Sequence, residues 1–436
     1  MRKRARLLAL ILLSALLATA LGGCAKKAVA PLAGTAEDDI LTFLPNVENR
    51  PIVRIGTQYY TPDTNLRDML QARFPDYLFV MDYSAAMGSS SERTLLSQLS
   101  QGAYYDMIIT GKPSSFLFDT GALLVDLSAE RFLDSYLLSA LNDVSVGGHI
   151  YSIPGASTLA GIAFNADLFA EHGWEIPKTH DDFFALCDEI RATGIAPFST
   201  NFKYVSQVCR LLTMMSYADL FANQAGTEWL LSLQQNNGRF TGRMEPLLEV
   251  VERFAAGGLL TADDFTASLT QQRQAFWAGE YAMIDYDSGI FTYAKAEDAP
   301  FSVGIMPYPA RRAENAGFSV TPEYYISIPK SVEQNPARLA LMKEVLAFLS
   351  TQEGQEAMIA DSLRISAVKD IDLPDNPAAD YTREAYAQGN LYPLVYLGGI
   401  GIPYYSLLQA SALMVVQGAS VQEAVAAIDK GIDDAL

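Results

Sequence analysis

Strand-like and helix-like hydrophobic patterns alternate along the chain from residue 51 onward. Ile52–Gly56 and Leu78–Met81 are short apolar runs, and Tyr105–Thr110 is apolar enough to be buried on both faces. Between the first two runs, Asn65–Phe74 repeats apolar residues at helical spacing. This alternation predicts an α/β fold in which mainly parallel sheets are flanked by helices.

Helical patterns later in the chain carry start and stop signals, such as Thr179 before one helix and Gly194 after it. Helices are predicted over Thr179–Ala192, Glu333–Leu349, Gln352–Ala360 and Val421–Ile432. Ligands of open α/β sheets bind at the carboxyl ends of strands. The loops that follow Gly56 and Thr110 are therefore candidate parts of a binding site.

The first 23 residues have the pattern of a targeting segment. Four basic residues lie before an apolar run, Leu7–Ala20, that is too short for a transmembrane helix of about 20 residues. The small residues directly before Cys24 resemble the cleavage signal of bacterial lipoproteins, which implies removal of residues 1–23 and lipidation of Cys24. The alternative is an ordinary secretory peptide with a chance cysteine. Residues 24–50 lack periodicity and predict a flexible tether.

The charge of the chain argues against a polyanionic partner. The formal net charge is −19, and loss of the four basic residues in the targeting segment takes it to −23. Such a surface repels nucleic acid and anionic membranes. The length, about 410 residues after processing, allows two domains of ordinary size.

The cysteines and histidines do not indicate a metal site. Cys187 and Cys209 both fall in predicted helices with apolar neighbours, where they could form a disulfide or remain buried free thiols. The three histidines, His149, His172 and His180, lack the spacing of metal ligands and are interpreted as surface residues.

An ordered set of short motifs fills the stretch Gly148–Pro197. A strand that ends at Pro154 is followed by a crossover of small residues, by the aromatic-Asn-x-Asp-Leu-Phe block Phe164–Phe169, and by a Pro-Lys-Thr helix start with a Gly-Ile-x-Pro end. This order resembles the central motif of the family 1 extracellular solute-binding proteins, the receptors of ABC importers. Similar family elements occur at Gly121–Leu127, Ala275–Met283, Val303–Pro309, Glu344–Gln355 and Gly418–Ala424.

The resemblance implies a two-lobed periplasmic-binding-protein fold of type II. Each lobe is then a mainly parallel sheet flanked by helices, and three crossovers form the hinge, near Gly155–Gly161, Phe318–Tyr325 and Leu363–Val368. The N-terminal lobe comprises residues 51–158 plus 322–363, and the C-terminal lobe residues 159–320 plus 366–436. In this family the ligand binds between the open lobes and favours their closure.

The resemblance also implies a function without catalysis. The chain is expected to be a monomeric, extracytoplasmic receptor that binds a sugar and docks on the transmembrane subunits of an ABC importer. The lipid at Cys24 would hold it on the outer face of the cell membrane. Neither a cofactor nor a metal nor a nucleic acid is implied.

Sugar receptors of this family combine aromatic rings that stack on sugar faces with polar groups that satisfy hydroxyls. Both are needed, because a buried hydroxyl without a partner costs a few kcal/mol. By position and chemistry, the candidates in the N-terminal half are Tyr59, Tyr60, Asp63, Thr110, Lys112 and Thr158. Those in the C-terminal half are Asn201, Tyr204, Tyr286, Asp287, Phe291, Tyr404 and Tyr405. The family's stacking Trp after Ala282-Met283 is absent here, and Gly289 lies near its place.

Three other interpretations stay open. Asp285 and Asp287 could be the paired carboxylates of a glycosidase, but no second acidic motif supports catalysis. Acidic residues such as Asp63 could instead pair with a polyamine or another cationic solute. Adjacent tyrosines, which occur four times in the chain, could supply phenolate ligands to ferric iron.

Overall fold

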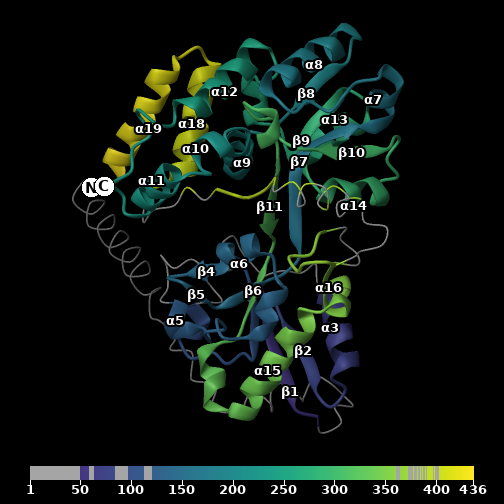
Figure 1. The fold of residues 1–436 in the computed structure, drawn as a ribbon, viewed down its shortest axis with the longest axis vertical. Coiled ribbons are helices and arrows are strands. Elements are labelled where there is room, and N and C mark those ends of the chain that lie inside the picture. The colour runs from purple at the N-terminus through teal and green to yellow at the C-terminus, as the bar shows by residue number, and fades with distance from the viewer. Residues whose placement is uncertain are drawn as a thin grey trace, which may run out of the picture. The chain divides into compact units, whose positions relative to one another are not determined.

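The structure is a computed structural model that describes residues 50–57, 63–83, 97–111, 120–359, 364–371, 390–395 and 402–436, with single positions between 377 and 397. The chain divides into two compact units, Met1–Ile52 and Val53–Leu436. Nearly all described secondary structure belongs to the second unit (Figure 1). No helix in the described ranges is long and apolar enough to cross a bilayer.

The first of two main sheets has five strands. Its strand order is β2 (Leu78–Asp82), β1 (Ile52–Thr57), β3 (Met107–Thr110), β12 (Tyr325–Ser327) and β6 (Ser152–Pro154). β1 and β3 are parallel, whereas β12 is antiparallel to both β3 and β6. Apolar residues of this sheet form one core with the helices α3 (Asp63–Arg73), α15 (Pro336–Leu349) and α16 (Gln352–Ile359).

The second sheet lies in the larger α/β part of the unit. Its order is β13 (Leu391–Pro393), β11 (Phe318–Pro322), β7 (Ser157–Asn165), β9 (Tyr281–Asp287) and β8 (Ala196–Ser199), with β10 (Val303–Met306) also paired to β7. Its main core includes residues of α8 (His180–Ala192), α9 (Val205–Met215), α12 (Glu245–Ala256), α18 (Tyr404–Val416) and α19 (Val421–Ala435).

Shorter elements complete the described chain. They are α5 (Thr120–Leu123), η2 (Arg131–Ser135), α6 (Leu138–Val144), β4 (Ser145–Val146), β5 (His149–Ile150), α7 (Ala166–His172), α10 (Tyr217–Leu220), α11 (Gln224–Gln234), η3 (Ala262–Phe265), α13 (Leu269–Trp277), α14 (Gly289–Ala296), η4 (Ala313–Asn315) and η5 (Lys330–Gln334).

Both sheets are mixed rather than mainly parallel, which differs from the sequence prediction. The chain passes from the first sheet to the second between β6 and β7, and it returns between β11 and β12. The strands on either side of these two passages run in opposite directions. In the second sheet β7 therefore pairs antiparallel with β11, and in the first sheet β6 pairs antiparallel with β12. Parallel pairing remains for β1 with β3, β8 with β9, and β11 with β13.

Close packing joins the segments that connect the two sheets. A Cβ atom at Gly155 would overlap the ring of Tyr324, so a larger residue at that position would force this buried ring to move. Ser157 and Ile365 exchange backbone hydrogen bonds of 2.9 and 3.0 Å, which ties a third connecting segment to the first.

The predicted helices are confirmed, with one difference. α8 begins after Thr179, which forms a capping box with Asp182, and α19 begins after Ser420, which forms one with Glu423. The helix predicted over Glu333–Leu349 is divided into η5 and α15. Its break falls at Asn335, whose side chain accepts from the backbone amide of Arg338 and so caps α15.

Cys187 and Cys209 are free, buried thiols. Burial raises the pKa of each thiol to about 12. His149 and His172 are exposed as predicted, but His180 is half-buried and its Nε2 lies 3.0 Å from the carbonyl oxygen of Met215.

We expect both thiols to resist alkylation in the folded protein, because the reactive thiolate is scarce and shielded. Iodoacetamide at pH 8 should label neither Cys187 nor Cys209 until urea unfolds the chain, as followed by mass spectrometry of their peptides. Rapid labelling of either peptide without urea would contradict the packing described for it.

Candidate ligand-binding site

Polar side chains gather where β8 and β9 end beside the start of β7. Because β8 and β9 are parallel, their carboxyl ends meet at one edge of the sheet, the usual position of ligands in α/β folds. The register pairs Ser199 with Ile284, which brings Thr200 next to Asp285. Asp287, at the end of β9, pairs with Ala160 of β7, close to Thr158.

Asp285 is a fully buried carboxylate in this region. It accepts hydrogen bonds from the hydroxyl of Tyr308 (2.6 Å), from Nη2 of Arg210 (3.2 Å) and from the hydroxyl of Thr200 (3.5 Å). Burial, followed by the charge of Asp285, keeps the pKa of Tyr308 well above its usual range, so Tyr308 remains a donor. Asp285 is therefore satisfied by protein groups alone.

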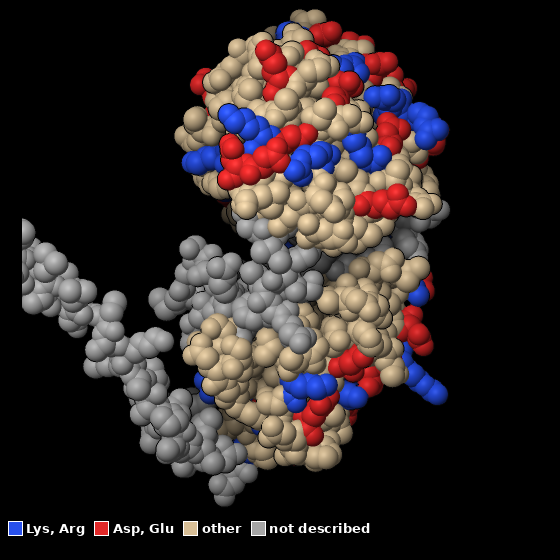
Figure 2. Space-filling model, turned by 90° about the vertical axis from the view of Figure 1, so that its left-hand side faces the viewer, with Lys and Arg blue, Asp and Glu red and all other residues tan. Residues whose placement is uncertain are grey.

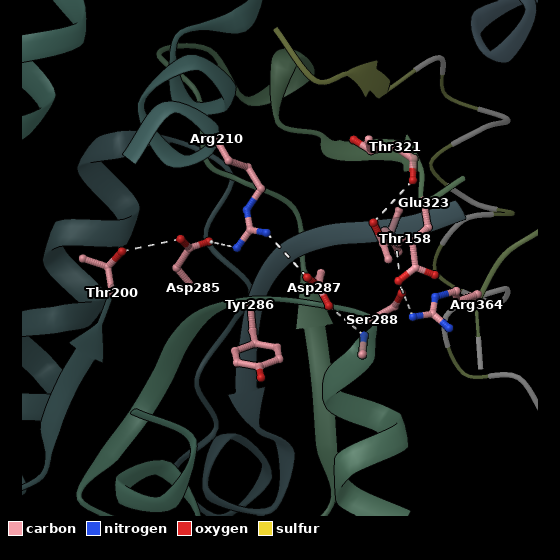
Figure 3. A network of polar contacts seen from close by, with 12 residues as sticks. Thr158, Thr200, Arg210, Asp285, Tyr286, Asp287, Ser288, Thr321, Glu323 and Arg364 are labelled. Atoms are coloured by element: carbon pink, nitrogen blue, oxygen red, sulfur yellow. Dashed lines mark hydrogen bonds and ion pairs between the residues drawn. The ribbon is translucent and has the colours of Figure 1, made fainter. Parts of the chain in front are cut away.

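Arg210 links this buried carboxylate to an accessible one. Its Nη1 lies 3.6 Å from Oδ2 of Asp287, whose side chain is 31% exposed (Figure 3). Oδ1 of Asp287 accepts from the backbone amide of Gly289 at 2.9 Å. Burial opposes the charge of Arg210, but Asp285, Tyr308 and Asp287 outweigh it and raise its pKa. We call Thr200, Arg210, Asp285, Asp287 and Tyr308 the Arg210 cluster.

A second ion pair lies beside this cluster. Nη2 of Arg364 donates to Glu323 at 2.6 Å, and both side chains are partly exposed. Burial raises the pKa of Glu323 and the charge of Asp287 adds to the shift, although Arg364 opposes it. Thr158 donates to the carbonyl oxygen of Thr321 over 3.4 Å. Figure 3 shows Thr158, Glu323 and Arg364 on the side of Asp287 away from Thr200.

The candidates predicted near the first sheet are mostly not described. Tyr59, Tyr60 and Lys112 lie outside the described residues, as does the side chain of Asp63 at the start of α3. Thr110 is fully buried at the end of β3, where its hydroxyl donates to the carbonyl oxygen of Gly111 at 2.8 Å.

Three predicted aromatic contacts lie in packed cores. Tyr286 is only 7% exposed, and its hydroxyl accepts from Arg273 at 3.3 Å. It points away from Arg210 because successive strand residues face opposite sides (Figure 3). Phe291 packs in the same cluster of apolar residues as Tyr286. Tyr404 is fully buried and donates to the carbonyl oxygen of Leu233 at 3.2 Å. These positions argue against ligand contacts for all three.

The other C-terminal candidates differ in accessibility. Asn201 is buried; its amide nitrogen donates to the carbonyl oxygen of Ala267 at 2.8 Å, while its Oδ1 has no hydrogen-bond partner among the described residues. Tyr204 is 40% exposed at the start of α9. Tyr405 is half-buried against the second-sheet core.

Sequence reasoning missed Arg210, Thr200, Glu323 and Arg364. A signal for Arg210 exists, because it is the one charged residue in the otherwise apolar or neutral helix α9. A charge on such a helix is seldom buried unless it is paired. Thr200, Glu323 and Arg364 lie in connecting segments, where no hydrophobic period marks a side chain as inward-facing.

A cavity of about 340 Å³ lies elsewhere on the second sheet, beside β10 and β11. Its lining is largely apolar and includes Phe164, Ile305 and Phe318. None of the sequence-predicted ligand contacts lines it. The Arg210 cluster is the better site because it places an accessible carboxylate, that of Asp287, at the strand ends where ligands bind.

The surface charge of the chain does not form a single-sign field on the face shown in Figure 2. Basic and acidic side chains are intermixed there. The negative net charge therefore does not by itself identify a cationic ligand.

The sequence resembles a known protein family and two known proteins. The family model described as bacterial extracellular solute-binding protein matches residues 78–385. An uncharacterized ABC transporter extracellular-binding protein of Pyrococcus horikoshii is 26% identical over 280 residues, which cover 60% of this chain and 61% of that protein. The multiple sugar-binding protein of Streptococcus mutans is 24% identical over 199 residues, 44% of this chain and 46% of that protein. The matched regions thus cover about three fifths or less of the length of these relatives.

A solved structure covers more of the chain. The binding protein RafE in complex with raffinose superimposes with a TM-score of 0.69 at 15% identity, covering 88% of this chain and 99% of that one. At this identity the likeness concerns the fold, which is the two-domain periplasmic-binding type.

Proposed function

Since the chain belongs to the bacterial extracellular solute-binding proteins, we propose that it captures a carbohydrate between two closing lobes and delivers it to an ABC importer. This family binds solutes for ABC transporters outside the cytoplasm and is not enzymatic. In this proposal, residues 51–158 plus 322–363 form one lobe, and residues 159–320 plus 366–436 form the other. The ligand stabilises the closed arrangement by binding it more tightly than the open one.

The balance of positive and negative groups in the site supports a neutral ligand with hydroxyl groups. Asp285 and Asp287 share Arg210, and Glu323 pairs with Arg364, so three carboxylates face two guanidinium groups. Only one negative charge is left uncompensated. A sugar hydroxyl both donates and accepts, so it can use carboxylate and guanidinium groups together. A polyamine offers donors alone and would meet two arginines.

The relatives support the same ligand class. The name of the Streptococcus mutans relative refers to multiple sugars, and the superimposed RafE structure contains raffinose. Half-buried Tyr405 and exposed Tyr204 remain our candidates for stacking, and Asn201, Thr158 and Asp287 for hydroxyl contacts. Tyr59, Tyr60, Asp63 and Lys112 are proposed as contributions from the other lobe. Thr110 is no longer proposed as a ligand contact, because it is fully buried and its hydroxyl donates to Gly111.

Ferric iron fits the described tyrosine pairs poorly. Tyr324, Tyr325 and Tyr404 are buried, and burial raises the pKa of Tyr404 and of Tyr104, which disfavours the phenolate that would bind iron. In the described part of the chain, no group of three or more His, Cys, Asp or Glu side chains could hold a metal ion.

Asp287 provides the direct test. Its replacement with alanine should weaken raffinose binding at least tenfold in isothermal titration calorimetry, because a charge-assisted hydrogen bond to a ligand hydroxyl is lost. Asp188→Ala, which removes an exposed carboxylate of α8 paired with Arg191, is the matched control and should bind as the wild type does. Equal raffinose affinity in both variants would exclude Asp287 from the binding site.

We also propose that Cys24 carries the lipid anchor. In a bacterial host grown with radiolabelled palmitate, the wild-type protein should carry the label and Cys24→Ala should not, since the variant lacks the thiol to which the acyl chains attach. Autoradiography of the immunoprecipitated proteins measures the change. Labelling of the variant as strong as that of the wild type would contradict the anchor.

A further inference from the structure

Asp285 and Asp287 compete for one guanidinium group. Nη2 of Arg210 donates to Asp285 at 3.2 Å, whereas Nη1 lies 3.6 Å from Asp287, beyond a normal hydrogen bond. Asp285 is inaccessible and Asp287 is 31% exposed. The buried carboxylate therefore holds Arg210 more closely than the exposed one does.

The competition matters because Arg210 has little access to water. Its side chain is only 11% exposed, and its Nε is buried without a hydrogen-bond partner among the described residues. A guanidinium in this setting needs a carboxylate partner, since a buried charge without one is strongly unfavourable. If Asp285 did not bind it, Arg210 would draw closer to Asp287.

We propose that Asp285 is a positioning residue that keeps Asp287 available to the ligand. By holding Arg210, Asp285 leaves the Asp287–Arg210 contact too long for a hydrogen bond, so Oδ2 of Asp287 can accept one from a ligand hydroxyl. Arg210 still compensates the charge of Asp287, which favours a neutral ligand over a cationic one. This inference rests on the proposed function for the assignment of Asp287 to the ligand.

A double-mutant cycle tests the shared guanidinium without any ligand. Urea unfolding of the full chain, in a detergent without a sugar head group, is measured for wild type, Asp285→Asn, Asp287→Asn and the double variant. Each single variant leaves Arg210 one carboxylate, and the double variant leaves none. Each variant reduces the folding equilibrium constant by some factor. The factor for the double variant should be at least tenfold larger than the product of the factors for the two single variants.

The control cycle pairs Asp285→Asn with Asp188→Asn, a distant exposed carboxylate, and should be additive. Additivity in the Asp285–Asp287 cycle as well would overturn the proposal. If Asp285→Asn does not fold, Arg210→Gln replaces it in the cycle, because it removes the guanidinium that the two carboxylates share. Additivity of Arg210→Gln with Asp287→Asn would show that Arg210 does not contact Asp287 and would overturn the proposal equally.

Raffinose titration distinguishes positioning from a purely structural role. Asp285→Asn should weaken raffinose binding at least tenfold although Asp285 is buried, whereas a structural role alone would lower stability and leave the affinity of the folded protein unchanged. Unchanged affinity would overturn the positioning role. If raffinose does not bind the wild type, raffinose is not its ligand, and the unfolding cycle still decides whether Arg210 is shared.

Discussion

Replacement of Asp106 with alanine is expected to lower the free energy of unfolding by about 3 kcal/mol, the largest loss we predict for a single charged residue. Asp106 is fully buried next to β3. It accepts two hydrogen bonds from Arg338 of α15, at 2.6 and 3.0 Å, together with one from the backbone amide of Arg54 and one from the hydroxyl of Tyr104. The side chain of Arg338 is only 18% exposed, so removal of Asp106 leaves a largely buried guanidinium without this carboxylate.

Urea unfolding followed by circular dichroism measures this effect, and Asp68→Ala is the matched control. Asp68 also contacts an arginine, Arg67, but both side chains are largely exposed, so its loss should change stability by less than about 1 kcal/mol. Similar losses for the two variants would show that Asp106 does not stabilise the packing of α15 on the first sheet.

Phe254→Ala should lower the free energy of unfolding by about 3–5 kcal/mol, the loss typical of buried phenylalanines replaced with alanine. Phe254 of α12 is 1% exposed and packs against three other rings. Its ring centroid lies 5.7 Å from that of Phe183, 5.3 Å from Phe184 and 5.5 Å from Phe198, which joins α12 and α8 to β8. Alanine would leave a cavity among these aromatic residues.

Leu231→Ala in α11 is the control for this loss, because Leu231 is 49% exposed. It should be within about 0.5 kcal/mol of wild type in the same urea experiment, as surface substitutions usually are. Phe254→Leu, which fills most of the cavity, should recover part of the stability. A loss for Phe254→Ala no larger than that for Leu231→Ala would contradict the packed aromatic cluster.

The fold was predictable from sequence because its signals are local and repeated. Capping residues such as Thr179 and Ser420 lie where their helices begin, and short apolar runs mark β1, β2 and β3. The antiparallel pairs were not predictable from strand and helix alternation alone. They arise because the chain crosses between the sheets and returns, a long-range property that β7 and β11 reveal only in three dimensions.

The site was less predictable than the fold. Asp287 was predicted from its place shortly after Ala282-Met283 and from its chemistry, and it stays a proposal, whereas neighbouring Tyr286 was included without regard to strand alternation. Tyr404 and Tyr405 are adjacent on α18, and only packing shows that the first is fully buried and the second is not. Arg210 reaches Asp285 and Asp287 from a separate helix 75 residues away in sequence from Asp285, a pairing that no local pattern contains.

The most direct test of the central claim is a thermal-unfolding screen of the full chain, in a detergent without a sugar head group, against raffinose, other oligosaccharides, spermidine and ferric iron. A ligand at 100 times its dissociation constant stabilises the folded protein by about 2.7 kcal/mol, a readily measured shift. We predict stabilisation by a sugar and none by spermidine or iron. Stabilisation by spermidine or iron with every sugar silent would contradict a carbohydrate receptor.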